Sequence, residues 1–292
     1  MPVEKILFAT KFREPSYQAL MELLELKKVG LREIVLLNVI PREEVAYVPF
    51  GGYLRDKALE MMESAKLKFQ EWEKELQERG LRTKIIVEVS EPVAKILEIA
   101  ELERVDLLVI GRKRVLSPLS PEIPLKIVSR SKIPVLIYRR IVHYEIDGEL
   151  FQRENVQIFK KPLLATDFSE SSKRAAHFLM NFNALIEKLF VVHILKEGTL
   201  EAISREDLAN IEAQIKVKLH TVLEEYKPFN IKGDYFLGIG DPPKEILEFA
   251  REKESTLIVL GKTGKGLLKC LLLGSVSKEL IHHSEIPLLI VP

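Results

Sequence analysis

The sequence predicts an α/β protein built from two tandem domains, each with a doubly wound, five-stranded parallel sheet. Two observations lead to this prediction. The two halves of the 292-residue chain resemble each other, and each half alternates short apolar runs with longer amphipathic ones. Such a strand–helix alternation requires a parallel sheet with helices on both faces.

The repeat is visible in three pairs of segments. ILFATKFREPSYQAL, from Ile6, matches PLLATDFSESSKRAA, from Pro162. Further along, EPVAKILEIAELERVDLLVIG, from Glu91, matches DPPKEILEFAREKESTLIVLG, from Asp241. The endings SKIPVLIY and SEIPLLIV also correspond. We therefore expect one domain in residues 1–140, a second in 161–292, and a linker in 141–160 that can contain a short hairpin.

The expected strands of the second half are nearly continuous apolar runs, as strands buried on both faces require. They are PLLAT, LFVVHIL, KGDYFLG, TLIVLG and IPLLIV. Amphipathic segments lie between them, and the Pro242–Pro243 pair suits a first helical turn, where a missing N–H costs nothing. The long helices of the two halves are expected over 55–80 and 205–226.

Composition limits the class of protein. The 44 Lys and Arg residues nearly cancel the 43 Asp and Glu residues, so no strong overall field attracts nucleic acid or a membrane surface. The single cysteine, Cys270, excludes an internal disulfide and fits a reducing compartment. No apolar run reaches membrane-spanning length, and the N-terminus lacks a signal-peptide pattern. We expect a cytoplasmic protein without a nucleic-acid or membrane partner.

The stretch GKTGKGLLKCLLLGSVS, which begins at Gly261 after an expected strand, resembles a phosphate-binding loop. A Walker loop would place Lys and Ser or Thr where Leu267 and Leu268 stand, so it is not one. The Gly238-Ile239-Gly240 segment lacks the third glycine of a dinucleotide fingerprint. The spacing that remains is G-x2-G-x9-G-S, in Gly261, Gly264, Gly274 and Ser275.

This spacing resembles the nucleotide-binding signature of the universal stress protein family, and TDFSE, VVHIL and GDPPKEIL also look like that family. The resemblance implies an adenine nucleotide alpha hydrolase-like fold. It implies ATP or AMP as ligand, with or without Mg²⁺. It also implies that the two halves pack as a pseudo-dimer through their last strands, and a homodimer of whole chains stays open.

The expected ligand contacts follow from chemistry and from the resemblance. Glycines allow backbone N–H groups to approach phosphate oxygens, and a helix N-terminus favours an anion. A carboxylate after the first strand can accept a hydrogen bond from a ribose hydroxyl or from adenine. We expect either serine at the start of the last helix to cap it. The candidate site residues are Thr166, Asp167, Ile194, Gly240, Gly261, Gly264, Gly274, Ser275, Val276 and Ser277.

Other polar residues are expected to have structural roles. Ser169 is an expected N-cap, His193 a satisfied core histidine, and Trp72 a core residue. Adjacent helical residues point in different directions, so His282 and His283 are expected to be structural or surface residues. The remaining expectations are an inert Cys270 and solvated side chains for Lys262 and Lys265.

The first half departs from the signature. Lys11 replaces Asp167, and in an ungapped comparison Arg114 and Pro124 stand where Gly264 and Gly274 do. Arg112, Lys113 and Arg114 make this loop cationic, and Pro118, Pro121 and Pro124 remove N–H donors. We expect that this half does not bind ATP in the family's mode and serves as a packing partner. The alternative is that Lys11 and the arginines bind another anion.

Three functions remain open. The first is a nucleotide-dependent regulator in the stress response, which binds ATP or AMP in its second half. The second is a slow ATPase, for which the sequence offers no clear base and no second acid placed for Mg²⁺ except Asp241. The third is a scaffold that binds no nucleotide. We assign no catalytic residue and no metal ligand.

Overall fold

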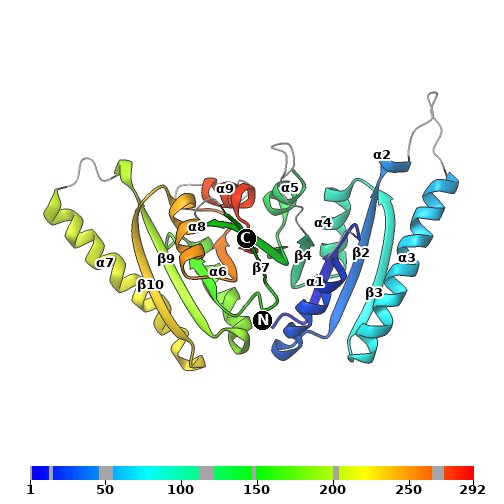
Figure 1. The fold of residues 1–292 in the computed structure, drawn as a ribbon, viewed down its shortest axis with the longest axis horizontal. Coiled ribbons are helices and arrows are strands. Elements are labelled where there is room, and N and C mark those ends of the chain that lie inside the picture. The colour runs from blue at the N-terminus through cyan, green and yellow to red at the C-terminus, as the bar shows by residue number, and fades with distance from the viewer. Residues whose placement is uncertain are drawn as a thin grey trace. The chain divides into compact units, whose positions relative to one another are not determined.

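The computed structural model describes residues 2–12, 16–45, 55–111, 122–146, 149–199, 204–264 and 273–292. The chain divides into two compact units, Pro2–Tyr138 and Arg139–Pro292. Each unit has its own parallel sheet with helices against it (Figure 1).

The sheet of the first unit contains five parallel strands in the order β3-β2-β1-β4-β5. Their bounds are β1 Lys5–Ala9, β2 Glu33–Pro41, β3 Arg82–Ser90, β4 Leu107–Gly111 and β5 Val135–Tyr138. The helices are α1 Ser16–Glu22, α2 Arg42–Val45, α3 Arg55–Glu78, α4 Pro92–Leu102 and α5 Glu122–Arg130, with a 3₁₀ helix at Leu23–Val29.

The second unit repeats this arrangement, in the order β10-β9-β8-β11-β12. Its strands are β8 Pro162–Ala165, β9 Lys188–Lys196, β10 Lys232–Gly240, β11 Leu257–Gly261 and β12 Leu288–Val291. Its helices are α6 Glu170–Leu179, α7 Arg205–Glu224, α8 Pro242–Glu252 and α9 Ser275–His283. Three 3₁₀ helices lie at Met180–Leu185, Glu197–Thr199 and Lys227–Phe229.

A separate two-stranded sheet precedes β8. Strand β6, Ile141–Ile146, pairs antiparallel with β7, Glu149–Glu154. The short hairpin expected in the linker is therefore present.

The cores form where the sequence has its apolar runs. All four residues of β8 and of β12 and all five of β11 are buried, whereas the outer strand β10 is largely exposed along its first half. Helices α3 and α7 lie along the outer strands β2–β3 and β9–β10 (Figure 1). Trp72 of α3 contacts the rings of Phe8, Phe12, Tyr17 and Phe69, so its expected core role is confirmed.

The strand order indicates where on each sheet a ligand would bind. In each sheet the order reverses beside the first strand, between β1 and β4 and between β8 and β11. Ligands of doubly wound sheets bind beyond the carboxyl ends of the strands at such a point. The predicted fold class is confirmed for both halves, with the predicted five strands in each sheet.

Candidate functional site

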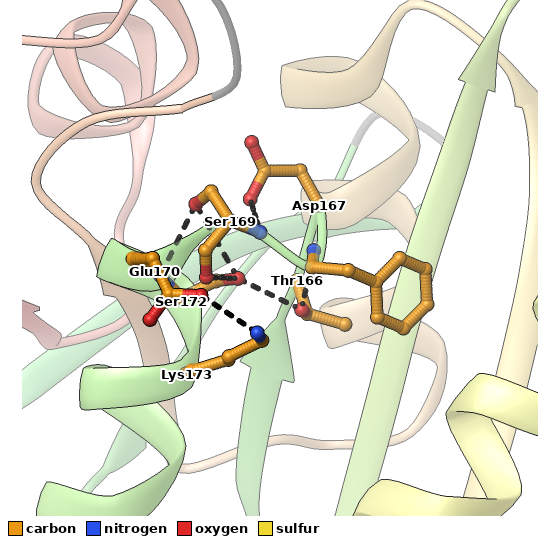
Figure 2. A network of polar contacts seen from close by, with 7 residues as sticks. Thr166, Asp167, Ser169, Glu170, Ser172 and Lys173 are labelled. Atoms are coloured by element: carbon orange, nitrogen blue, oxygen red, sulfur yellow. Dashed lines mark hydrogen bonds and ion pairs between the residues drawn. The ribbon is translucent and has the colours of Figure 1, made fainter.

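Asp167 lies in a tight turn directly after β8. Phe168 adopts a left-handed backbone conformation, with φ of 60°, which is uncommon for a residue with a side chain. The turn is fixed because the Phe168 N–H donates to Thr166 Oγ1 at 3.0 Å and the Ser169 N–H donates to Asp167 Oδ1 at 3.0 Å (Figure 2). The backbone therefore holds the Asp167 carboxylate in place at the strand end.

Helix α6 begins beside this turn, and serine hydroxyls join the two. Ser169 is the N-cap residue, as expected, and its Oγ accepts from the Ser172 N–H at 3.3 Å. The Ser172 hydroxyl is buried, donates to the Ser169 carbonyl at 2.9 Å and lies 3.1 Å from Thr166 Oγ1 (Figure 2). Thr166 is thus used internally, through its hydroxyl, to connect β8 to α6.

The exposed side of the same turn carries a local ion pair. Lys173 Nζ donates to Glu170 Oε1 at 2.7 Å, and this hydrogen bond lowers the pKa of the Glu170 carboxyl (Figure 2). Both side chains are more than half exposed, so the pair contributes little to stability. A negative charge in the first turn of α6 also suits the helix dipole.

Packing explains why residue 261, at the end of β11, is a glycine. A Cβ at this position would lie 2.6 Å from the Ser171 carbonyl carbon and 2.7 Å from the Ser172 nitrogen. Both atoms are backbone, so they cannot move aside without shifting α6. The close approach of helix to strand therefore requires this glycine, independently of any phosphate.

The other two signature glycines converge with Asp167. A Cβ at Gly264 would lie 2.9 Å from Asp167 Oδ2, and a Cβ at Gly274 would lie 3.5 Å from the Gly264 nitrogen. The Gly274 N–H donates to the Lys262 carbonyl at 2.9 Å, which ties the start of α9 to the end of β11. Strand ends β8 and β11 and the start of α9 thus meet at one place.

Among the described residues, no side chain caps the start of helix α9. Gly274 is the N-cap residue and offers no side chain, so the prediction that Ser275 or Ser277 caps the helix is wrong. The Ser277 hydroxyl is buried and donates instead to the carbonyls of Gly261 and Lys262, at 3.0 and 3.3 Å. Ser275 is exposed and Val276 is half-buried at this helix start.

Two residues beside the loop differ from expectation. Lys262 is buried, 5% exposed, so the prediction that it is solvated is wrong. Its backbone N–H donates to the Val291 carbonyl at 2.7 Å, which holds the residue against the sheet. Ser171, which the sequence did not single out, accepts from the Thr263 N–H at 3.3 Å and donates to Val291 at 3.4 Å. Its signal was the run of serines that follows TDF.

Strand β9 supports the site from the other side. His193 Nδ1 lies 2.6 Å from the Thr166 carbonyl oxygen, and its ring lies 4.9 Å from that of Phe168. The expectation that this histidine is satisfied by a hydrogen bond is confirmed, and its side chain is half-buried beside the core. Ile194 is buried and in register with Gly238 of β10. The resemblance implies that its backbone contacts the edge of an adenine, and this stays a prediction.

Gly240 is placed farther from the cluster than the other candidates. It ends β10, and the whole of β9 lies between β10 and β8, a separation of roughly 10 Å for two strand spacings. Its φ is +153°, and a Cβ there would lie 2.7 Å from Glu245 Oε1 of α8. This glycine has a local reason in the start of α8, where Asp241 is the N-cap position, as expected from the Pro pair.

His283 lies on the surface, and the neighbouring His282 is half-buried. His283 Nε2 lies 3.3 Å from Glu279 Oε2 on the same helix face. Among the residues that the structure describes, no group of three His, Cys, Asp or Glu side chains could hold a metal ion. Within that same part of the chain, no helix is long and apolar enough to cross a membrane. Cys270 and Lys265 lie outside the described residues.

The corresponding place in the first half has the same backbone and different chemistry. Phe12 is left-handed with φ of 54°, and its N–H donates to Thr10 Oγ1 at 2.9 Å, as Phe168 does to Thr166. Asn38 Nδ2 donates to the Thr10 carbonyl at 2.7 Å, where the second half has His193. Lys11, between Thr10 and Phe12, stands where the second half has Asp167.

The last helices correct the ungapped comparison. Ser131 and Ser284 each donate through Oγ to the carbonyl two residues on, Ile133 and Ile286, so these positions correspond. Counting back along α5 and α9 places Pro124 opposite Ser277, not opposite Gly274. A proline at this position has no hydroxyl to donate to the strand end. Arg112, Lys113, Arg114, Pro118 and Pro121 lie outside the described residues.

Fold and site together define a tandem doubly wound α/β protein with a glycine-lined strand-end site in its second half. A model of the universal stress protein family matches residues 2–139 and 159–292. The chain belongs to the universal stress protein family, as the sequence resemblance indicated, with two family domains in tandem.

Two curated relatives come from Methanocaldococcus jannaschii. Universal stress protein MJ0531 is 32% identical over 54% of this chain and 95% of its own length, and universal stress protein MJ0577 is 28% identical over 46% and 95%. A solved universal stress protein from Archaeoglobus fulgidus covers 99% of this chain and 96% of its own, with a TM-score of 0.68 and 22% identity. This last likeness concerns the fold of the whole chain.

Proposed function

We propose that the second half of this universal stress protein binds ATP or AMP and acts as a nucleotide-dependent regulator in the stress response. The observation that carries the proposal is the convergence of Asp167, Gly264 and Gly274, so close that a Cβ added at Gly264 would lie only 2.9 Å from Asp167 Oδ2. A hydrogen-bond acceptor and a helix N-terminus thereby adjoin the same small loop.

Each part of the site suits one part of the ligand. The Asp167 carboxylate can accept from the hydroxyls of a ribose, and the start of α9 can donate its first N–H groups to phosphate oxygens. No side chain of the described residues caps that helix start. The helix dipole adds a partial positive charge at the same point.

Gly274 supports the phosphate assignment. Internal packing explains Gly261, because a Cβ there would collide with the backbone of α6. At Gly274 the nearest described atoms would lie 3.4 to 3.6 Å from a Cβ, which is close to ordinary van der Waals contact. Packing within the described residues therefore does not require glycine here, whereas the close approach of a phosphate does.

Isothermal titration of the whole chain with ATP and AMP, with and without Mg²⁺, tests the proposal. We expect one nucleotide per chain and no ADP in the titrated sample. ADP formation would support the slow ATPase, and two sites would contradict the loss of the site in the first half. No binding of either nucleotide would leave the scaffold as the function of this fold.

A further inference from the structure

An open cavity of about 390 Å³ lies in the first half, at the carboxyl ends of β1 and β2. Its walls come from the last residues of β2, from α2 and from one face of α3. Ligand sites in proteins commonly have volumes of about 300–1,000 Å³ and combine an apolar floor with a few polar groups. This cavity meets both criteria.

The floor is apolar and the rim is charged. Val39 and Ile40 of β2 and Ala65 of α3 are buried, and Met61 lies beside them half-buried. Three lysines and two glutamates complete the lining, which leaves an excess of one positive charge. The three lysines are Lys11, Lys57 and Lys68.

Lys11 is held only weakly by its own chain. Its Nζ lies 3.4 Å from Glu44 Oε1, and the two side chains are 35% and 49% exposed. Such a pair contributes little in water, so a ligand oxyanion can compete with Glu44 for the ammonium group. Lys68 Nζ lies 5.3 Å from the centre of the Phe12 ring, and Phe12 also lines the cavity. Among the described residues, Lys57 and Lys68 have no carboxylate partner.

The second half is the internal reference. Lys218 lies over Phe168 at 5.7 Å, as Lys68 lies over Phe12, so α7 and α3 correspond in register. In that register Ile215, a larger side chain that is also buried, stands where Ala65 does. At the strand end, Asp167 stands where Lys11 does. The first half therefore differs from the second in two ways. It has a smaller side chain at this position of the long helix, and it has the opposite charge beside its first strand.

We propose that this cavity binds a small organic anion, in which an apolar body rests on Ile40, Met61 and Ala65 and an oxyanion contacts Lys11 and Lys68. A carboxylate in place of Lys11 would select a hydroxyl donor, whereas an ammonium group selects a carboxylate, phosphate or sulfonate. The cavity lies on the α3 side of β1 and β2. The proposal does not depend on nucleotide binding in the second half.

Fluorescence titration of the whole chain with anilinonaphthalene sulfonate tests the proposal, because this probe joins an aromatic body to one oxyanion. N-phenylnaphthylamine, which has a similar body without the sulfonate, is the reference probe. We expect saturable sulfonate binding that weakens about tenfold in Lys11→Gln and in Lys68→Gln, about 1.4 kcal/mol each. The neutral probe should bind both variants as it binds the parent chain.

Three further variants sharpen the result. Lys218→Gln removes the matching lysine of the second half and should leave sulfonate binding unchanged. Glu44→Gln removes the internal competitor for Lys11 and should strengthen it. Ala65→Ile copies the second half and should abolish binding of both probes, and circular dichroism and the melting temperature would check that it folds.

Three outcomes would overturn the proposal. The first is that the parent chain shows no saturable sulfonate binding. The second is that affinity is unchanged in both Lys11→Gln and Lys68→Gln, which are exposed positions whose replacement does not threaten folding. The third is that Lys218→Gln weakens binding as much as Lys68→Gln does, since the probe would then not distinguish the two halves.

Discussion

The turns after β1 and β8 have the same backbone and opposite charges. Both use a threonine hydroxyl to accept the N–H of a left-handed phenylalanine, and in both a polar side chain from the next strand contacts the threonine carbonyl. Only the residue between, Lys11 or Asp167, changes the sign of the group presented to a ligand. The repeat therefore preserves the support of the site and varies its chemistry.

A second difference concerns how tightly helix and strand pack. A Cβ at Gly261 would meet the backbone of α6 at 2.6 Å, whereas a Cβ at the matching Gly111 meets no described atom within 4 Å. Gly261 is buried and Gly111 is exposed. The glycine that both halves share is thus required by packing in the second half. In the first half, packing among the described residues does not require it.

The largest effect is expected when the charge of the second half is made like that of the first. Asp167→Lys removes the acceptor for a ribose hydroxyl and should weaken ATP or AMP binding about 100-fold, since hydrogen bonds to charged groups contribute about 1.5–3 kcal/mol. Titration calorimetry measures this change. The matched variant Lys11→Asp should leave nucleotide affinity unchanged.

Two results would argue against this account. If Lys11→Asp weakened binding as much as Asp167→Lys, the nucleotide would lie in the first half. If neither variant changed the affinity, Asp167 would be only a residue of the turn, through its hydrogen bond with the Ser169 N–H.

The next effect is on stability. Gly261→Ala should destabilise the second unit by about 2 kcal/mol, because overpacking against backbone typically costs 1–3 kcal/mol. The melting temperature should fall by about 4–8 °C. Gly111→Ala is the matched control and should leave it nearly unchanged. Equal effects of the two substitutions in calorimetric melts would contradict the packing explanation of Gly261.

The sequence was sufficient to predict the fold because buried parallel strands leave nearly continuous apolar runs, and the repeat gave each run twice. It also singled out Asp167, Gly264 and Gly274, which lie close together in the structure, and their contact with a nucleotide stays a prediction. The prediction that Ser275 or Ser277 caps α9 was wrong. A serine that caps a helix and a serine buried within a helix look the same in a sequence. Only the path of the chain shows that Ser277 faces Gly261.

Lys262 and Pro124 show the same limit in different ways. Lysine is usually exposed, so the sequence did not indicate that Lys262 is only 5% exposed. Pro124 was assigned to the wrong counterpart because the loops before α5 and α9 differ in length. The two helices align correctly only when they are counted back from Ser131 and Ser284, which make the same hydrogen bond. The cavity beside Lys11 was not predictable, since it depends on which face of α3 meets β2.

The smallest expected effect concerns a tyrosine–glutamate hydrogen bond between α1 and α3. The Tyr17 hydroxyl donates to Glu75, whose other oxygen accepts from Arg79 at 2.6 Å. Partial burial and this hydrogen bond raise the pKa of Tyr17 to about 12. In the second half Lys173 takes the corresponding place and pairs with Glu170 instead.

The sign of the pH dependence follows from this raised pKa. Unfolded tyrosine has a pKa of about 10, so the folded state favours the protonated phenol, and its contribution is fully present below pH 10. That contribution is lost as the pH rises from about 10 to 12. Because the pair is partly exposed to solvent, we expect less than about 1 kcal/mol.

Denaturant unfolding of the parent chain and of Tyr17→Phe across this pH range measures the effect. The single tryptophan, Trp72, is a suitable probe, since its ring lies 5.4 Å from that of Tyr17. Tyr17→Phe should be slightly less stable than the parent at neutral pH and should converge with it by pH 12. A difference that stayed constant with pH would mean that Tyr17 contributes through packing on Trp72 and not through its bond to Glu75.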